Sequence, residues 1–97
     1  MVIDLCITML YNIEELIWDD QNIEHIKKHS VTSIEIEEVC LKPICSFESY
    51  EKRLIVLGKT RNSRLLTLVL APKDKGVYYL VTARDTSRKE RRLINEK

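Results

Sequence analysis

Hydrophobic positions recur with a helical period in the first part of the chain. Residues 16–18 end a short predicted strand, and Asp19 follows with a side chain that suits a helix N-cap. Ile23 and Ile26 then lie on one face of the chain, as in an amphipathic helix packed on a core. The pattern predicts a strand that stops at Asp19 and a helix over residues 20–29.

A second helix is predicted directly after the first. Thr32 and Glu35 have the spacing of a capping box, in which each side chain accepts a hydrogen bond from the other residue's backbone amide. The helix ends at about Leu41, because Pro43 disfavours helical geometry in the residue before it.

The hydrophobic period changes from 3.6 residues to two after this point. Ser87 and Glu90 repeat the capping-box spacing and open a closing helix. Strand-like stretches with short polar connections, which favour antiparallel hairpins, cover residues 44–50, 52–58, 64–71 and 77–83. The chain is therefore predicted to be one α+β domain over residues 1–97, an antiparallel meander sheet with two N-terminal helices and one C-terminal helix.

The register of one hairpin decides which basic side chains meet. If its turn centres on Arg61 and Asn62, then Arg64 lies opposite Lys59 at one end of a sheet face, with Arg53 at the other end. A slip of one residue would move the two strands' side chains to opposite faces. In the centred register the shared face carries Ile55, Leu57, Leu66, Leu68 and Leu70.

Charge is divided unevenly along the chain, although the net charge is only +1. Residues 1–51 hold 3 Lys/Arg and 11 Asp/Glu, a net of −8, whereas residues 52–97 hold 13 Lys/Arg and 4 Asp/Glu, a net of +9. A basic half of this kind indicates a polyanionic partner such as nucleic acid. The alternative is that the two halves pair with each other within the fold.

The densest basic segment follows the last predicted strand. Guanidinium groups bind phosphate oxygens two at a time and stay charged at any physiological pH. Together with Lys59 and Arg64, the segment predicts a phosphate-binding corner, although its arginines would also suit a solvated surface helix. They are Arg84, Arg88, Arg91 and Arg92.

Few other residues suggest catalysis. The chain has only two glycines, which excludes a glycine-rich phosphate loop. Glu90 is the acid among the arginines, and it serves either the capping box with Ser87 or proton transfer. His25 and His29 lie four residues apart on the first helix, where His29 is either a proton acceptor or a partner of the helix dipole.

The cysteines bear on the compartment and on metal binding. Their odd number, without a secretory signal or membrane span, favours reduced thiols in the cytoplasm. Cys40 and Cys45 do not combine with the histidines in a zinc-finger spacing, so no metal or cofactor is predicted. Met9 is an alternative start, which would make the residues before it an artefact.

Several short motifs are specific in their order and spacing. They are Trp18-Asp19, Lys28-His29-Ser30-Val31, residues 35–38, Arg53, Gly58-Lys59-Thr60, Arg64-Leu65-Leu66, Ala83-Arg84, Ser87, Glu90 and Arg91. Across residues 16–94 this series resembles the BrnT toxins of bacterial type II toxin–antitoxin pairs, which share the RelE-like ribonuclease fold; residues 1–12 remain outside as an extension. Two departures concern glycine, because Ser30 and the pair Asn62-Ser63 stand where the family commonly has one.

The resemblance implies an mRNA endonuclease that arrests growth and is neutralised by a BrnA-like antitoxin, with a hetero-oligomer that binds DNA through the antitoxin. It implies basic residues rather than a metal around the scissile phosphate. Arg64, Arg84 and Glu90 match the catalytic pattern, with His29 as the other proton acceptor. The RNA-binding residues would be Arg53, Lys59, Arg88, Arg91 and Arg92. The competing interpretations are a catalytically inactive module of the same fold that binds nucleic acid, and one that only docks the antitoxin.

Overall fold

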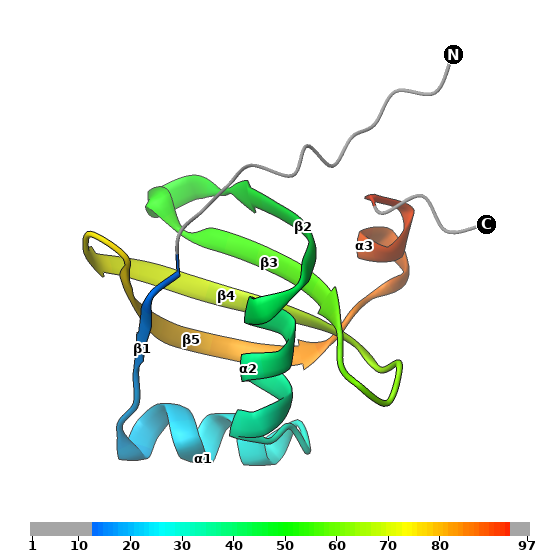
Figure 1. Cartoon of the computed structure of the whole chain (residues 1–97), viewed down its shortest axis with the longest axis horizontal. Helices are drawn as coiled ribbons and strands as arrows, with labels where there is room; N and C mark the ends of the chain where they lie inside the picture. The colour runs from blue at the N-terminus through cyan, green and yellow to red at the C-terminus, as the bar shows by residue number, and fades with distance from the viewer. Residues whose placement is uncertain (1–12, 94–97) are drawn as a thin grey trace.

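The computed structural model describes residues 13–93 and has an α+β fold, in which three α-helices accompany a five-stranded sheet (Figure 1). The predicted extension over residues 1–12, with the alternative start at Met9, lies outside the described residues. The elements are β1 (Glu15–Ile17), α1 (Asp20–Lys28), α2 (Ser33–Leu41), β2 (Pro43–Glu48), the 3-10 helix η1 (Tyr50–Lys52), β3 (Leu54–Lys59), β4 (Leu65–Asp74), β5 (Val77–Asp85) and α3 (Arg88–Leu93).

The sheet is mixed rather than wholly antiparallel. Its strand order is β1-β5-β4-β3-β2, and the four strands from β2 to β5 form the predicted antiparallel meander. β1 adds to the outer edge of β5 in a parallel pairing that joins Glu15–Ile17 to residues 77–79. The prediction of a purely antiparallel sheet was wrong at this strand, because both helices and the whole meander separate β1 from its partner in sequence. Short-loop rules do not apply across that distance.

The β3–β4 hairpin differs from its predicted register by one residue. Lys59 pairs with Leu65 rather than Arg64, because the loop closes around three residues instead of two. The Thr60 amide donates to the Arg64 carbonyl, and Ser63 adopts a left-handed φ of 66°, the geometry of a three-residue hairpin loop. Consequently Leu54 and Val56, instead of Ile55 and Leu57, share a face with Leu66, Leu68 and Leu70.

Helices α1 and α2 cover that face of the sheet and build the core. Ile26 of α1 and Ile36 and Val39 of α2 are buried against leucines of the central strands. In Figure 1, α2 crosses the strands while α1 lies beside the β5 edge. Gly58 allows this close packing, because a Cβ at that position would lie 2.8 Å from a Val39 methyl carbon.

The predicted helix starts are confirmed by their capping bonds. Asp19 and Thr32 cap α1 and α2 in capping boxes with Asn22 and Glu35. The Ser87 hydroxyl accepts from the Glu90 amide, while the Glu90 carboxylate accepts from the Ser87 amide, so the third box is also present.

Ser30, which stands where the resembled family commonly has glycine, lies just after the end of α1. Ser30 has a φ of 57°, its amide donates to the Lys27 carbonyl, and the Val31 amide donates to the Ile26 carbonyl. These bonds form a Schellman motif, whose left-handed residue is usually glycine.

Two features were not predicted. The 3-10 turn η1 forms the connection between β2 and β3, where one strand was predicted to reach residue 50 and the next to begin at residue 52; it has left-handed φ values at Glu51 and Lys52. Cys45 is disulfide-bonded, so the expectation of reduced thiols was wrong for this residue. Cys40 is free and half-buried, and burial raises the pKa of its thiol to about 11.

Candidate nucleic-acid interface

Arg84 lies at the end of β5 and forms a tight ion pair. Its cross-strand neighbour is Thr67 of β4, which alternates with the core leucines and therefore faces away from α1 and α2. Two nitrogens of the Arg84 guanidinium, Nη1 and Nη2, donate to the two carboxylate oxygens of Glu90 at 2.8 and 2.7 Å. This geometry is the two-pronged contact that arginine also makes with phosphate.

Neighbouring polar groups complete the environment of the Glu90 carboxylate. Oε1 lies 3.0 Å from the hydroxyl of the buried Thr67 and accepts from the Ser87 amide at 2.9 Å. The hydroxyl of Thr86, also buried, lies 3.1 Å from that of Thr67. We call this group of five residues, Thr67, Arg84, Thr86, Ser87 and Glu90, the Arg84 cluster.

These contacts shift the proton affinities of the ion pair. The Arg84 guanidinium, assisted by the Ser87 amide and the Thr67 hydroxyl, lowers the pKa of Glu90 to about 2 against the opposing effect of burial. The bond to Glu90 raises the pKa of Arg84. Both groups are therefore charged at neutral pH, and Glu90 is a weak proton acceptor while these donors face it.

Further basic side chains surround the Arg84 cluster. Lys59 ends β3 on the same face as Thr67, and its side chain is exposed. On α3, Arg88, Arg91 and Arg92 are also exposed. Among residues 13–93, none of these four side chains forms an ion pair within 4 Å, so this end of the sheet carries uncompensated positive charge.

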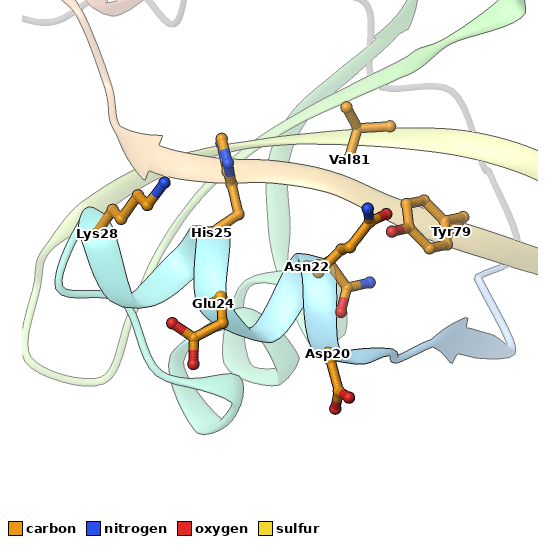
Figure 2. Close-up of a pocket in the computed structure, with 8 residues that line it drawn as sticks. Asp20, Asn22, Glu24, His25, Lys28, Tyr79 and Val81 are labelled. Carbon is orange, nitrogen blue, oxygen red and sulfur yellow. The ribbon is translucent and has the colours of Figure 1, made fainter.

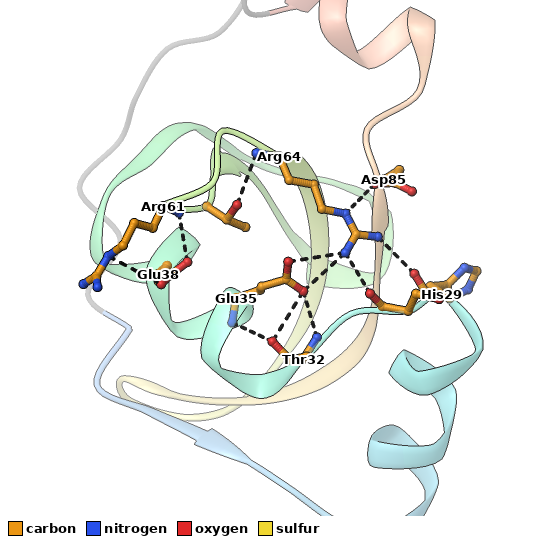
Figure 3. A network of polar contacts seen from close by, with 9 residues as sticks. His29, Thr32, Glu35, Glu38, Arg61, Arg64 and Asp85 are labelled. Atoms are coloured by element: carbon orange, nitrogen blue, oxygen red, sulfur yellow. Dashed lines mark hydrogen bonds and ion pairs between the residues drawn. The ribbon is translucent and has the colours of Figure 1, made fainter.

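Arg64 belongs to a different network, on the face covered by α1 and α2 (Figure 3). Its Nε donates to Asp85 at 2.8 Å, and its Nη1 reaches the carboxylate of Glu35 at 3.3 Å. Nη1 and Nη2 also donate to the backbone carbonyls of Ser30 and His29 at 2.7 and 3.1 Å. We call these five residues the Arg64 network.

The pKa shifts in the Arg64 network follow from the same contacts. The hydrogen bond from Arg64 lowers the pKa of Asp85, and the bond to Asp85 raises the pKa of Arg64. Each Arg64 nitrogen with a proton therefore has a partner in the loop after α1, in α2 or at the end of β5. With four of its five N–H groups bonded, this guanidinium holds these elements together and has little capacity left for an external anion.

The predicted single basic corner is divided by the sheet. Arg64 and Arg84 project from opposite faces, so they do not converge on one phosphate; the β4–β5 register explains this, because it sets Arg84 opposite Thr67, three residues from Arg64 along the chain. Arg53 lies at the other end of the sheet, where it pairs with Glu51 at 3.8 Å. It is four residues from Leu57, the β3 residue in line with Arg84, or about 13 Å along the strand.

His29 is placed with Arg64 rather than with Arg84. It is the C-cap of α1, its side chain is exposed, and its ring centroid lies 5.3 Å from that of His25. Its charge contributes to lowering the pKa of Asp85, whereas Glu90 responds to Arg84. The structure therefore separates the two candidate proton acceptors.

A polar cavity of about 590 Å³ lies between α1 and β5, beside His25 (Figure 2). Lys28, Asn22 and Tyr79 also line it, and the Tyr79 hydroxyl reaches the Asp19 carboxylate at 3.0 Å. Among the described residues, none of the predicted phosphate-binding residues lines this cavity.

Sequence reasoning did not identify Thr67, Thr86 or Asp85. The two threonines matter only because the β4–β5 register sets Thr67 opposite Arg84, and this register contains two irregularities that no short motif indicates. Asp85 had one available signal: as the next residue after Arg84 in a strand, it must project to the other face.

Comparisons with known proteins do not identify the chain. No protein-family model matches it, and no curated protein matches it. In the part of the chain that the structure describes, no helix is long and apolar enough to cross a membrane. Within the same residues, no three His, Cys, Asp or Glu side chains converge as metal ligands would.

Proposed function

We propose that this chain is the toxin of a type II toxin–antitoxin pair, a metal-independent endoribonuclease of the BrnT type with a RelE-like fold. In this proposal it cleaves mRNA and arrests growth. The observation that supports it most is the position of Arg84. This residue lies at the end of β5, beside the exposed arginines of α3, and its guanidinium makes a two-pronged contact with a carboxylate. The α+β fold and the β2–β5 meander are compatible with this function.

The chemistry follows from the substrate. RNA carries a 2′-hydroxyl that can attack the adjacent phosphate, so the protein needs only to orient the strand, stabilise developing charge and move protons. In the proposed mechanism Arg84 contacts the non-bridging oxygens of the scissile phosphate. The exposed side chains of Lys59, Arg88, Arg91 and Arg92 hold neighbouring phosphates.

Glu90 is better placed than His29 to accept the proton of the 2′-hydroxyl. It contacts Arg84 directly, whereas His29 lies with the Arg64 network on the other face. With a pKa of about 2, Glu90 can act only after Arg84 and Thr67 have turned from it to the phosphate. His29 remains a candidate only if the RNA passes around the β5 edge.

Arg64 and Arg53 take supporting roles in this mechanism. Arg64 fixes the end of β5, and thereby the backbone of Arg84, through its bond to Asp85. Arg53 would reach only a more distant part of the bound strand, because it lies at the other end of the sheet.

The partners follow from the same proposal. A BrnA-like antitoxin would neutralise the toxin, and the resulting hetero-oligomer would bind DNA through the antitoxin. We expect both proteins in the cytoplasm, where mRNA is translated.

An inactive binding module of the same fold is the alternative function. The observation in its favour is that Arg64 and Arg84 are both already paired and that Glu90 is a weak base. Such a module would bind RNA through the same arginines, or dock only the antitoxin, and would cleave nothing.

An RNA cleavage assay with the purified chain separates the two functions. The toxin should cut single-stranded RNA to products with 2′,3′-cyclic phosphate ends, also in EDTA, and should spare the same oligonucleotide with 2′-deoxyribose at the cut position. RNA that stays intact while it binds the protein would favour the inactive module. Cleavage that requires a divalent cation would contradict the proposed mechanism.

A further inference from the structure

The Glu90 carboxylate has more partners than helix capping requires. The capping box accounts for the Ser87 amide, which donates to Oε1. It does not account for the two Arg84 nitrogens or for the Thr67 hydroxyl, which belong to strands β5 and β4. The sheet therefore contributes three of the four donors around one anionic group.

The arrangement of these donors is that of an oxyanion site. An ionised carboxylate only accepts hydrogen bonds, so the Thr67 proton points to Glu90, and the Thr86 hydroxyl supplies the bond between the two threonines. The Thr67 hydroxyl is thus oriented by a buried neighbour before any ligand arrives. Two phosphate oxygens can accept hydrogen bonds from the same donors, which are the Arg84 guanidinium, the Thr67 hydroxyl and the Ser87 amide.

We propose that Thr67 and Arg84, with the Ser87 amide, form a binding site for one RNA backbone phosphate, and that Glu90 occupies this site in the free protein as an internal substitute for the phosphate. This inference rests on the proposed RNA-binding function. The incoming phosphate displaces the Glu90 side chain and takes over its donors.

The surroundings favour exchange of one anion for the other. Arg84 is 37% exposed and Glu90 only 17%, so an incoming phosphate meets the guanidinium at the surface. Glu90 comes from a six-residue helix whose other charged side chains are exposed and basic. A polyanion that binds those side chains raises the local concentration of phosphate next to Arg84.

The test compares RNA affinity in matched variants, with a 2′-O-methyl oligonucleotide that cannot be cleaved by its own hydroxyl. Glu90→Gln keeps the shape and the capping acceptor but removes the charge that competes for Arg84. We expect it to bind RNA roughly 10- to 100-fold more tightly than the unchanged chain, the range of one charge-assisted hydrogen-bonded contact. The control is Glu38→Gln, which removes one negative charge from the Arg61 pair and should change the affinity far less.

Two further outcomes decide the inference. Arg84→Ala should abolish the gain, so the double variant should bind no more tightly than Arg84→Ala alone. Equal affinities of Glu90→Gln and Glu38→Gln, or weaker binding by Glu90→Gln, would overturn the proposal.

A measurement on the unchanged chain avoids any effect of the substitutions on folding. Carboxyl NMR should show the pKa of Glu90 near 2 in the free protein and closer to its ordinary value in the RNA complex, because its donors have turned to the phosphate. A pKa that stays near 2 in the complex would contradict displacement. Neither test measures cleavage, so the site and the enzyme can fail separately. Displacement of Glu90, together with RNA that stays intact in the cleavage assay, would support this site and refute the enzyme.

Discussion

The Arg64 network and the Arg84 cluster lie at the same end of the sheet, on opposite faces, and use arginine differently. Arg64 divides its donors among two backbone carbonyls and two carboxylates from three separate parts of the chain. Arg84 directs both Nη nitrogens to one side chain on a short terminal helix, and its one contact with a backbone carbonyl, from Nη1 to Asp85, is longer at 3.4 Å. Backbone carbonyls cannot leave without unfolding a loop, whereas one side chain can be exchanged for another anion. From this difference in partner type, rather than from charge, we propose that Arg64 is structural and that Arg84 binds an external anion.

The same comparison explains how the two charged halves of the sequence meet. Arg61 and Arg64 pair with Glu38 and Glu35 of α2, so part of the basic half is neutralised by the acidic half within the fold. The arginines of α3 form no ion pair within 4 Å among the described residues, although the charge of Arg91 contributes to lowering the pKa of Asp85. Pairing of the two halves within the fold is thus confirmed for Arg61 and Arg64, whereas a polyanionic partner for the arginines of α3 stays a prediction.

Substitution of the two arginines should have opposite consequences, and the largest effect is expected at Arg84. Arg84→Ala should lower the rate of RNA cleavage about 100- to 1000-fold, the usual cost of one lost charge-stabilising donor in a transition state. Arg84→Lys should recover little, because an ammonium group cannot form a two-pronged contact. Single-turnover cleavage rates, with growth arrest in a bacterium as a second readout, test this.

Arg53→Ala is the matched control for that substitution, since it also removes one partly exposed guanidinium, but at the far end of the sheet. Full activity of a folded Arg84→Ala variant would show that the catalytic centre lies elsewhere.

Arg64→Ala should mainly reduce stability. Its loss leaves two carbonyls and two carboxylates without their charged donor, and we expect a decrease in the free energy of unfolding of about 2 to 3 kcal/mol. In a domain of this size the melting temperature should fall by on the order of 10 °C. Arg61→Ala, in the same loop but 88% exposed, should change it little. A melting temperature unchanged by Arg64→Ala would contradict the structural role of Arg64 and its contrast with Arg84.

RNA affinity should depend on salt through the Arg84 side only. With three to five phosphate contacts, raising the salt concentration from 50 to 200 mM should weaken single-strand binding roughly 20- to 130-fold, at ~0.7 per contact in the log–log slope. Replacing Arg88 and Arg91 by alanine should reduce the slope by about 1.4. The folded Arg64→Ala variant should keep the slope of the unchanged chain. Equal slopes in all three proteins would mean that RNA binds elsewhere.

Acid should weaken the two regions through different carboxylates. The pKa values of Glu90 and Asp85 are both lower in the folded protein than their ordinary values, so each carboxylate contributes stability that is lost in acid. For Glu90 this contribution is present above about pH 4.5 and is lost as pH falls toward 2. Arg84→Ala removes the main cause of the Glu90 shift and should flatten the dependence of unfolding free energy on pH in that range. Urea titrations between pH 5.5 and 2 measure this slope, and an unaltered slope in Arg84→Ala would contradict the Glu90 pKa.

Local signals predicted the elements but not the separation of the two regions. Capping residues such as Asp19, Thr32 and Ser87 act within four residues, so they identified the helix starts. The faces on which Arg64 and Arg84 project depend on the β4–β5 register, which contains two irregularities that no short motif indicates. The parallel partner of β1 depends on packing between distant segments. Sequence thus singled out both arginines but could not show that Arg64 is bonded to several parts of the fold while Arg84 is paired mainly with one side chain.

Ser30→Gly should give the smallest effect and sharpen the comparison from the Arg64 side. Ser30 holds the left-handed position of the α1 Schellman motif, while its carbonyl accepts from Arg64. Glycine adopts that conformation without the steric cost of a side chain and keeps the carbonyl, so the free energy of unfolding should rise by about 0.5 to 1 kcal/mol. RNA affinity should not change, because the Arg84 cluster is untouched. Ser33→Gly, at the first turn of α2 where the backbone is helical, is the control and should destabilise the protein instead. Denaturant unfolding of both variants tests the sign, and a destabilised Ser30→Gly would mean that the serine side chain contributes more than its backbone strain costs.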